Sequence, residues 1–186
     1  MDRYCKRRKP IRNFTCALTA ASLLSITDLA VKWVVTTIVM NPPRRIPILP
    51  FFDLVLVFNS GMSFGLFSEP GVWGPKILSG VAISIVGLLI VWLWHVQRMN
   101  EVIGIALVIG GAIGNVIDRV RNEAVTDFLS LYIDPYYWPV FNSADVFITI
   151  GVICFLLPKF GSELGVAHSD KIARKTRSHN ISIGDE

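Results

Sequence analysis

The chain has 186 residues, of which 52% are apolar, and its mean hydropathy is +0.53. Soluble domains of this length rarely contain so much apolar sequence, so these values exclude an ordinary soluble enzyme. The formal charge of +4 is concentrated at the two ends of the chain, and placement of charge on one side of a membrane explains it better than nucleic-acid binding.

Four stretches are long enough and apolar enough to cross a hydrocarbon core of ~30 Å. They are predicted to be membrane-spanning helices at 14–37, 74–94, 101–119 and 140–160. Twelve basic residues lie before the first stretch, after the last or in the turn at 95–100, against five in the opposite loops. The positive-inside rule therefore predicts that both termini are cytoplasmic. The predicted domains are a basic cytoplasmic tail at 1–13, a four-span membrane domain at 14–160 and a polar, disordered cytoplasmic tail at 161–186.

The first apolar stretch follows a basic segment, as a signal peptide does, but it continues to about residue 37 without a persuasive cleavage site. We therefore interpret it as a retained anchor. It contains Asp28 and Lys32, which lie four residues apart and hence on one face of a helix, where they can form an ion pair. Two roles are open for this pair: holding helices together, or acting on a substrate.

Residues 38–70 contain five prolines and alternating apolar stretches such as IPILPFFDLVLVF. This pattern predicts a small, extended, β-like platform outside the membrane rather than a helix. The motif NSGMSFG follows at 59–65. Its Asn59 supplies an amide donor and acceptor, and Gly61 lets another backbone approach closely. A plain turn is the simpler interpretation of this motif, and contact with an extended peptide is the functional one.

The second and third apolar stretches differ in character. The stretch at 74–94 is featureless except for two tryptophans that are typical of a membrane interface, so it is predicted to be scaffold. The stretch at 101–119 is rich in glycine, and the spacing of Gly110 and Gly114 predicts close packing against another helix.

The third stretch ends in the motif GNVIDR. Asn115 and Asp118 share a helix face, and Arg119 is expected to keep Asp118 ionised as its ion-pair partner. The next segment, 120–139, carries three tyrosines and Trp138. It is predicted to be an amphipathic segment that rests on the outer membrane surface, either as a partial lid or as an anchoring belt.

Two aspartates, Asp127 and Asp145, flank the entry to the last apolar stretch, which is preceded by WPVFNSAD. A carboxylate near hydrocarbon costs at least ~2.5 kcal/mol, so two of them at one membrane boundary indicate shared chemistry. Two close carboxylates titrate as a pair, which leaves one acid and one base near neutral pH. Such a pair can activate water against an amide carbonyl and protonate the leaving nitrogen.

Residue chemistry alone leaves three functions open. The first is hydrolysis by the two aspartates, and the second is a small transporter or proton pathway that uses Asp28, Lys32, Asp118 and Asp145 as a relay. The third is a membrane scaffold without catalytic activity. A serine-lysine pair of Ser63 with Lys32 or Lys76 is not supported by any spacing rule.

No metal site or disulfide framework is predicted. All three histidines fall on the predicted cytoplasmic side, away from the acids. Cys5, Cys16 and Cys154 are odd in number and lack the spacing of a disulfide framework or a zinc site.

Four motifs in series, NSGMSFG, GNVIDR, VTDF and FNSAD, resemble those of the lipoprotein signal peptidases, or type II signal peptidases. The resemblance covers about residues 24–160. It implies a membrane aspartic endopeptidase without a cofactor, with its active site at the outer face of the bacterial cytoplasmic (inner) membrane. Such an enzyme cuts diacylglyceryl-modified prolipoproteins before the lipidated cysteine. The implied partners are these precursors, membrane lipid and globomycin-type inhibitors, and no nucleic acid.

The same resemblance implies roles for individual residues. It places the catalytic aspartates at Asp127 and Asp145. It also indicates substrate-binding or supporting roles for Asp28, Lys32, Asn59, Gly61, Asn115, Asp118, Arg119 and Asn142. The chain departs from the family pattern at Glu123, because the family usually has glycine between the arginine and the VTDF motif. A carboxylate at this position is expected either to perturb the aspartate pair or to face water.

Overall fold

The computed structural model describes residues 2–61 and 73–156, and the side chains from residue 11 onward. Residues 62–65 of the NSGMSFG motif and the tail at 161–186 lie outside the described residues, so the predictions made for them stay predictions.

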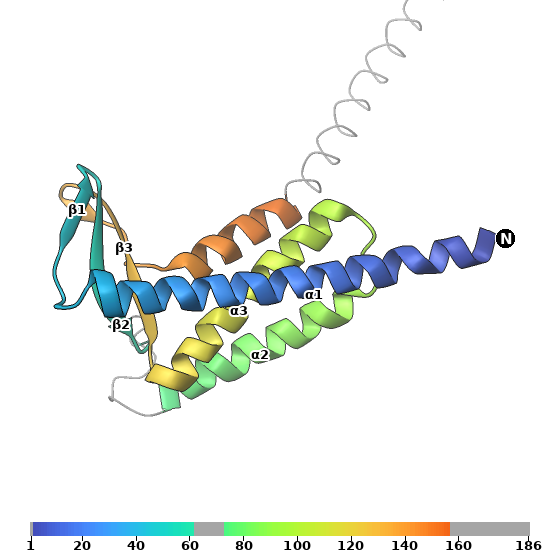
Figure 1. Cartoon of the computed structure of the whole chain (residues 1–186), viewed down its shortest axis with the longest axis horizontal. Helices are drawn as coiled ribbons and strands as arrows, with labels where there is room; N and C mark the ends of the chain where they lie inside the picture. The colour runs from blue at the N-terminus through green and yellow to red at the C-terminus, as the bar shows by residue number, and fades with distance from the viewer. Residues whose placement is uncertain (1, 62–72, 157–186) are drawn as a thin grey trace, which may run out of the picture.

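A bundle of helices forms the larger part of the described chain (Figure 1). It consists of α1 (Asp2–Val34), which continues as the π-helix η1 (Val35–Val39), α2 (Trp73–Leu93), α3 (Met99–Asn122) and the apolar helix Ser143–Leu156, called the last helix below. Three segments are long and apolar enough to cross a membrane: Ile11–Val39, Trp73–Leu93 and Met99–Asn122. The described part of the last helix is shorter than a full span, so the fourth crossing stays a prediction.

Helix α3 lies at the centre of the bundle because its glycines admit helices on two sides. A Cβ atom added to Gly110 would lie 2.9 Å from the Ala21 carbonyl oxygen of α1. A Cβ added to Gly111 would lie 2.5 Å from the Ala144 carbonyl oxygen of the last helix. Side chains at these two positions would therefore force both neighbours away from α3. The predicted close packing along the glycine-rich stretch is confirmed.

A four-stranded antiparallel sheet closes one end of the bundle, the end away from the N-terminus (Figure 1). We call this the sheet end. The strands are β1 (Ile46–Leu49), β2 (Phe52–Asn59), β3 (Val125–Ile133) and β4 (Tyr136–Tyr137), in the order β1-β2-β3-β4. The first two strands confirm the predicted extended platform.

The segment that follows α3 differs from its prediction. Residues 120–139 were expected to lie on the membrane as an amphipathic segment, but VTDFLSLYI within it forms β3 and pairs with β2. The physical reason is visible in this sequence, which is rich in β-branched and aromatic residues and fits a half-buried sheet position. Asp127 therefore lies on β3, one of the two inner strands of the sheet, and not on a loop. It is paired with Val57 of β2.

The residue that ends α3 has an unusual backbone conformation. Glu123 adopts φ 55 and ψ 12, in the left-handed region, and its side chain is exposed. An L-residue in this region costs about 1–2 kcal/mol, which glycine avoids. Of the two expectations for Glu123, the exposed position agrees with the one in which its carboxylate faces water.

Replacement of Glu123 with glycine is therefore expected to raise the free energy of unfolding by roughly 1 kcal/mol. Thermal unfolding of the purified protein in detergent measures this gain. Glu123→Ala is the matched control, since it removes the carboxylate but keeps the Cβ atom. An equal gain in both variants would show that the charge, and not the backbone conformation, is the source of the cost.

Candidate active site

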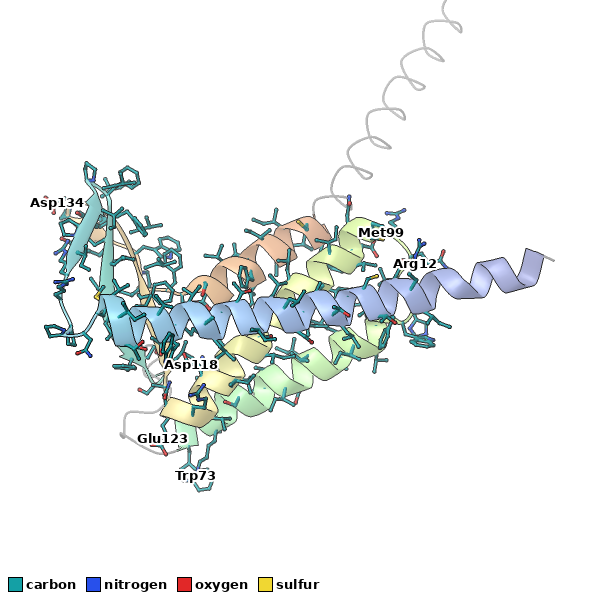
Figure 2. All side chains as sticks on the ribbon, in the orientation of Figure 1. Arg12, Trp73, Met99, Asp118, Glu123 and Asp134 are labelled. Carbon is teal, nitrogen blue, oxygen red and sulfur yellow. The ribbon has the colours of Figure 1, made fainter. Side chains whose placement is uncertain are left out.

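Five polar residues from four elements meet where the sheet joins the bundle. Asp127 comes from β3, and Asn59 ends the neighbouring strand β2. Asn115 lies on α3, about two helical turns before its end, and Asn142 and Asp145 lie at the start of the last helix. Figure 2 shows α3 reaching this junction, where its Asp118 is labelled.

The start of the last helix fixes the position of Asp145. The Asn142 backbone N–H donates to Asp145 Oδ2 at 3.1 Å, and the Asp145 N–H donates to Asn142 Oδ1 at 3.2 Å. This reciprocal pair is a capping box, in which the first and fourth residues of the motif satisfy the free N–H groups of a helix start. The sequence NSAD therefore turns the Asp145 carboxylate back toward the helix cap.

Asn142 also joins Asp145 to Asp127. Its side-chain Nδ2 donates to Asp127 Oδ1 at 2.6 Å, while its backbone binds Asp145. Both carboxylates are thus hydrogen-bonded to the same residue, which is completely buried. The two acids that flank the last apolar stretch in the sequence are brought together in space.

Two further asparagines complete the hydrogen bonding of these carboxylates. Asn59 Nδ2 donates to Asp127 Oδ2 at 3.0 Å, and Asn115 Nδ2 donates to Asp145 Oδ1 at 3.0 Å. Each of the four carboxylate oxygens therefore accepts one N–H group from an asparagine. Every oxygen has a second lone pair that these bonds leave available to a proton, a water molecule or a substrate.

The orientation of each asparagine amide is determined by a group that can only donate. The Gly61 N–H donates to Asn59 Oδ1 at 2.9 Å, and the Asp145 N–H donates to Asn142 Oδ1. Lys32 Nζ donates to Asn115 Oδ1 at 2.8 Å. Because an ammonium or backbone N–H requires an acceptor, each amide must direct its NH₂ group at a carboxylate. Gly61 takes φ 86, a conformation that favours glycine.

Lys32 is the centre of a second, buried cluster behind Asn115. Its Nζ lies 2.8 Å from Asp28 Oδ2 and 3.4 Å from Asp118 Oδ2. The predicted ion pair of Asp28 with Lys32 is confirmed. Ser143 of the last helix donates to Asp28 Oδ1 at 2.6 Å, so the cluster joins α1, α3 and the last helix. A Cβ atom on Gly114 would lie 2.5 Å from Asp28 Oδ2, so glycine at this position leaves room for the carboxylate.

The expected ion pair of Asp118 with Arg119 is not found among the described residues. Asp118 instead accepts the Thr126 backbone N–H at 2.7 Å and Asn122 Nδ2 at 2.7 Å, and Lys32 is its nearest cation. Neighbouring residues on a helix point in different directions, which explains the difference. Within the described part of the chain, Arg119 Nε is buried and has no hydrogen-bond partner.

The surroundings of Asp127 favour its protonated form. Burial raises the pKa of this carboxyl above its ordinary value of 3.8, and the nearby charge of Asp145 raises it further. The hydrogen bonds from Asn142 and Asn59 and the charge of Lys32 oppose this shift in pKa, since they stabilise the ionised form. A raised pKa at one member of a close pair is the arrangement that supplies an acid beside a base.

Two of these residues were not predicted. Ser143 acts through a contact between helices, and Thr126 acts through its backbone N–H. No sequence pattern identifies such contacts in advance, although Ser143 and Thr126 each lie within one of the quoted motifs.

Comparison with known proteins agrees with the motifs. The model of the family described as Signal peptidase (SPase) II matches residues 20–160. A lipoprotein signal peptidase of Bartonella bacilliformis is 41% identical over 140 residues, which is 73% of this chain and 81% of that protein. One of Vibrio parahaemolyticus is 37% identical over 147 residues, 77% of this chain and 86% of that protein.

A solved bacterial membrane enzyme has the same fold, with a TM-score of 0.68 and 27% sequence identity over 77% of this chain and 92% of that one. Sequence motifs, fold and family model thus agree over the same part of the molecule. The chain belongs to the signal peptidase II family.

Proposed function

We propose that this protein removes signal peptides from diacylglyceryl-modified prolipoproteins, cutting before the lipidated cysteine, with Asp127 and Asp145 as its catalytic dyad. Membership of the signal peptidase II family supports the substrate class. The observation that carries the mechanism is the shared hydrogen bonding of both carboxylates to Asn142. We infer from this arrangement that one water molecule can bind to both acids.

The proposed chemistry follows from one shared proton. The ionised carboxylate takes a proton from water while the resulting hydroxide attacks the carbonyl carbon of the scissile amide. The protonated carboxyl then donates its proton to the leaving nitrogen as the C–N bond breaks. The products are a signal peptide with a free carboxylate and a lipoprotein with a free cysteine amine. The proton taken from water restores the starting state of the dyad.

A catalytic dyad at a membrane boundary suits a substrate that is anchored in the membrane. Each CH₂ group withdrawn from a bilayer costs ~0.8 kcal/mol, so a diacylated precursor stays in the membrane while its peptide is cut. The proposed dyad comes from β3 and from the start of the last helix, at the junction of the helices with the sheet. We place this sheet end at the outer face of the bacterial inner membrane, as the distribution of basic residues predicts.

A proton or ion relay is less well supported by the same contacts. Such a path was predicted to use Asp28 of α1 and Asp118 of α3. Both of these acids contact Lys32 near the sheet. They form one cluster at a single depth and are not spread along the spans, as a path across the membrane requires.

The direct test of the proposed function is the mass of a purified precursor lipoprotein before and after incubation with the enzyme. The expected result is loss of the signal peptide from the lipidated precursor, and inhibition of that loss by globomycin. An unmodified precursor serves as the control substrate. Equal cleavage of both precursors, or a cut at another bond, would refute the proposed specificity.

The pH dependence of cleavage tests the role of Asp127. Asn59→Ala removes one donor that stabilises ionised Asp127, so the pKa of the proton-sharing pair is expected to rise. Activity requires that proton, and the alkaline limb of the kcat/KM profile should therefore move to higher pH. Asn122→Ala is the matched control, since Asn122 donates to Asp118, outside the dyad. A shift to lower pH in Asn59→Ala would contradict the assignment.

A further inference from the structure

An apolar cavity of about 450 Å³ lies in the sheet, away from the dyad. Its walls come from the turn between β1 and β2, the end of β3, and β4 with the residue that follows. They include Phe51, Leu131, Ile133, Tyr137 and Trp138. This volume is within the range of ligand pockets, roughly 300–1,000 Å³. The proposed hydrolysis makes no use of it.

Part of the cavity wall lies on the same face of β3 as Asp127, and Tyr132 contributes to the wall from the other face. Side chains two residues apart in a strand point to the same face, so Asp127 shares its face of β3 with Leu129, Leu131 and Ile133. Leu131 lies four residue steps along the strand from Asp127, a distance of about 13 Å. An apolar path thus leads from the carboxylate to the cavity wall.

The chain that returns to the dyad runs beside this path. The Trp138 N–H donates to the Leu131 carbonyl at 2.9 Å. Phe141 and Leu129 exchange backbone hydrogen bonds of 3.0 and 2.8 Å. The next residue is Asn142, which binds both carboxylates. The cavity and the dyad are therefore two ends of one hydrogen-bonded ladder, whose relative position is fixed.

The side of the cavity formed by Tyr132 is held in place by its neighbours. The Tyr132 and Tyr137 rings stack with centroids 5.2 Å apart, and the Arg45 guanidinium lies 5.3 Å from the Tyr132 ring centre. Arg45 is in turn paired with the buried Asp53 of β2. The adjacent Asp53 carboxylate raises the pKa of Arg45, so its charge persists.

Large apolar side chains around the cavity are exposed in the isolated chain. Ile133 and Tyr136 are each 79% exposed, and Trp138 is 69% exposed. A contiguous surface of this kind indicates an apolar partner. Figure 1 shows the β1 end of the sheet reaching sideways past the last helix, which leaves this part of the sheet beyond the bundle. Tyrosine and tryptophan in such a position are typical of a membrane interface.

We propose that this cavity binds an acyl chain of the diacylglyceryl group on the substrate cysteine; the proposal depends on the proposed function. The cavity lining has no charged side chain. A peptide there would leave backbone N–H and C=O groups without partners, whereas a hydrocarbon chain needs none. The fixed ladder sets the distance between the bound chain and the scissile bond. The cavity thereby selects lipidated over unlipidated precursors.

The test compares two lipopeptides with one peptide sequence, one carrying palmitoyl and the other butanoyl esters on the cysteine. Trp138→Ala removes an aromatic wall of the cavity and is expected to raise KM for the palmitoyl substrate by about tenfold or more. One methylene group in an apolar pocket already contributes about tenfold, so this is a lower estimate. KM for the butanoyl substrate and kcat for both should change little. Trp73→Ala is the matched control, because Trp73 is 70% exposed at the same end of the bundle but outside the cavity (Figure 2).

Each other outcome has a defined meaning. Equal changes in KM for both lipopeptides, or the same change in Trp73→Ala, would show general membrane contact and overturn the acyl-chain site. Binding of the two lipopeptides to Asp127→Asn, with and without Trp138→Ala, gives a readout independent of cleavage. If the wild type cleaves neither substrate, the proposed function fails. The binding data then test the acyl-chain site separately. Loss of the preference for the palmitoyl lipopeptide on addition of Trp138→Ala would support the site, and an unchanged preference would overturn it.

Discussion

Asp127→Asn is expected to reduce the rate of precursor cleavage by about 10²–10⁴-fold, the usual contribution of general acid–base catalysis. Asparagine keeps the size and planarity of the side chain but can neither ionise nor supply a proton. Asp145→Asn is expected to have the same effect, because the two carboxylates share one proton. The measurement is the initial rate of cleavage of a lipidated precursor, followed by mass.

Retention of the fold is part of this prediction. Asparagine at 127 can still accept one of the two N–H groups that reach Asp127. The thermal unfolding of both variants in detergent should therefore remain close to that of the wild type. Asp134→Asn is the matched control, since Asp134 is an exposed acid in the turn between β3 and β4 (Figure 2). Cleavage at the wild-type rate by either dyad variant would reject the mechanism.

Lys32→Met is expected to lower the free energy of unfolding by about 3–5 kcal/mol, because it leaves buried acids without their cation. Asp28 and Asp118 both lie within 3.4 Å of the ammonium group. Methionine has a similar length and no charge, so the effect comes from electrostatics and not from a cavity. Thermal or denaturant unfolding of the purified protein measures it.

The same substitution should also reduce cleavage through Asn115. Without the ammonium, nothing obliges the Asn115 carbonyl to face Lys32, and the amide can rotate its NH₂ group away from Asp145. The double variant Lys32→Met with Asp28→Asn removes one uncompensated charge and should recover part of the stability. Its cleavage should remain low, because Asn115 is still unoriented. Lys76→Met, at an exposed lysine on α2, is the control. Full activity in Lys32→Met would contradict this role.

The sequence predicted those features that depend on short-range spacing or on topology. Asp28 and Lys32 pair because they lie one helical turn apart, a relation that holds in any helix. The meeting of Asp127 with Asp145 was expected because both flank the entry to the last apolar stretch, at one membrane boundary. The glycines of α3 indicated close packing correctly. In each case one simple geometric rule is enough to predict from the sequence which residues lie close together.

Other features depended on contacts between distant segments and were misread or missed. The strand β3 was taken for a surface segment, because its aromatic continuation suggested a membrane interface. Asp118 was assigned to Arg119 as its chain neighbour, whereas the fold presents it to Lys32 and the Thr126 N–H. The dual role of Asn142 required the register between the last helix and β3. Such relations between elements cannot be obtained from local patterns.

In the proposed mechanism, Asp127 and Asp145 act as one unit on one water molecule. The most direct test is the cleavage rate of four enzymes: the wild type, the two single asparagine variants and the double variant. Residues that act together lose their whole effect with the first substitution. Both single variants and the double variant are therefore expected to be equally slow. A double variant slower than either single one by the product of their separate effects would contradict this mechanism, since the two acids would then act independently.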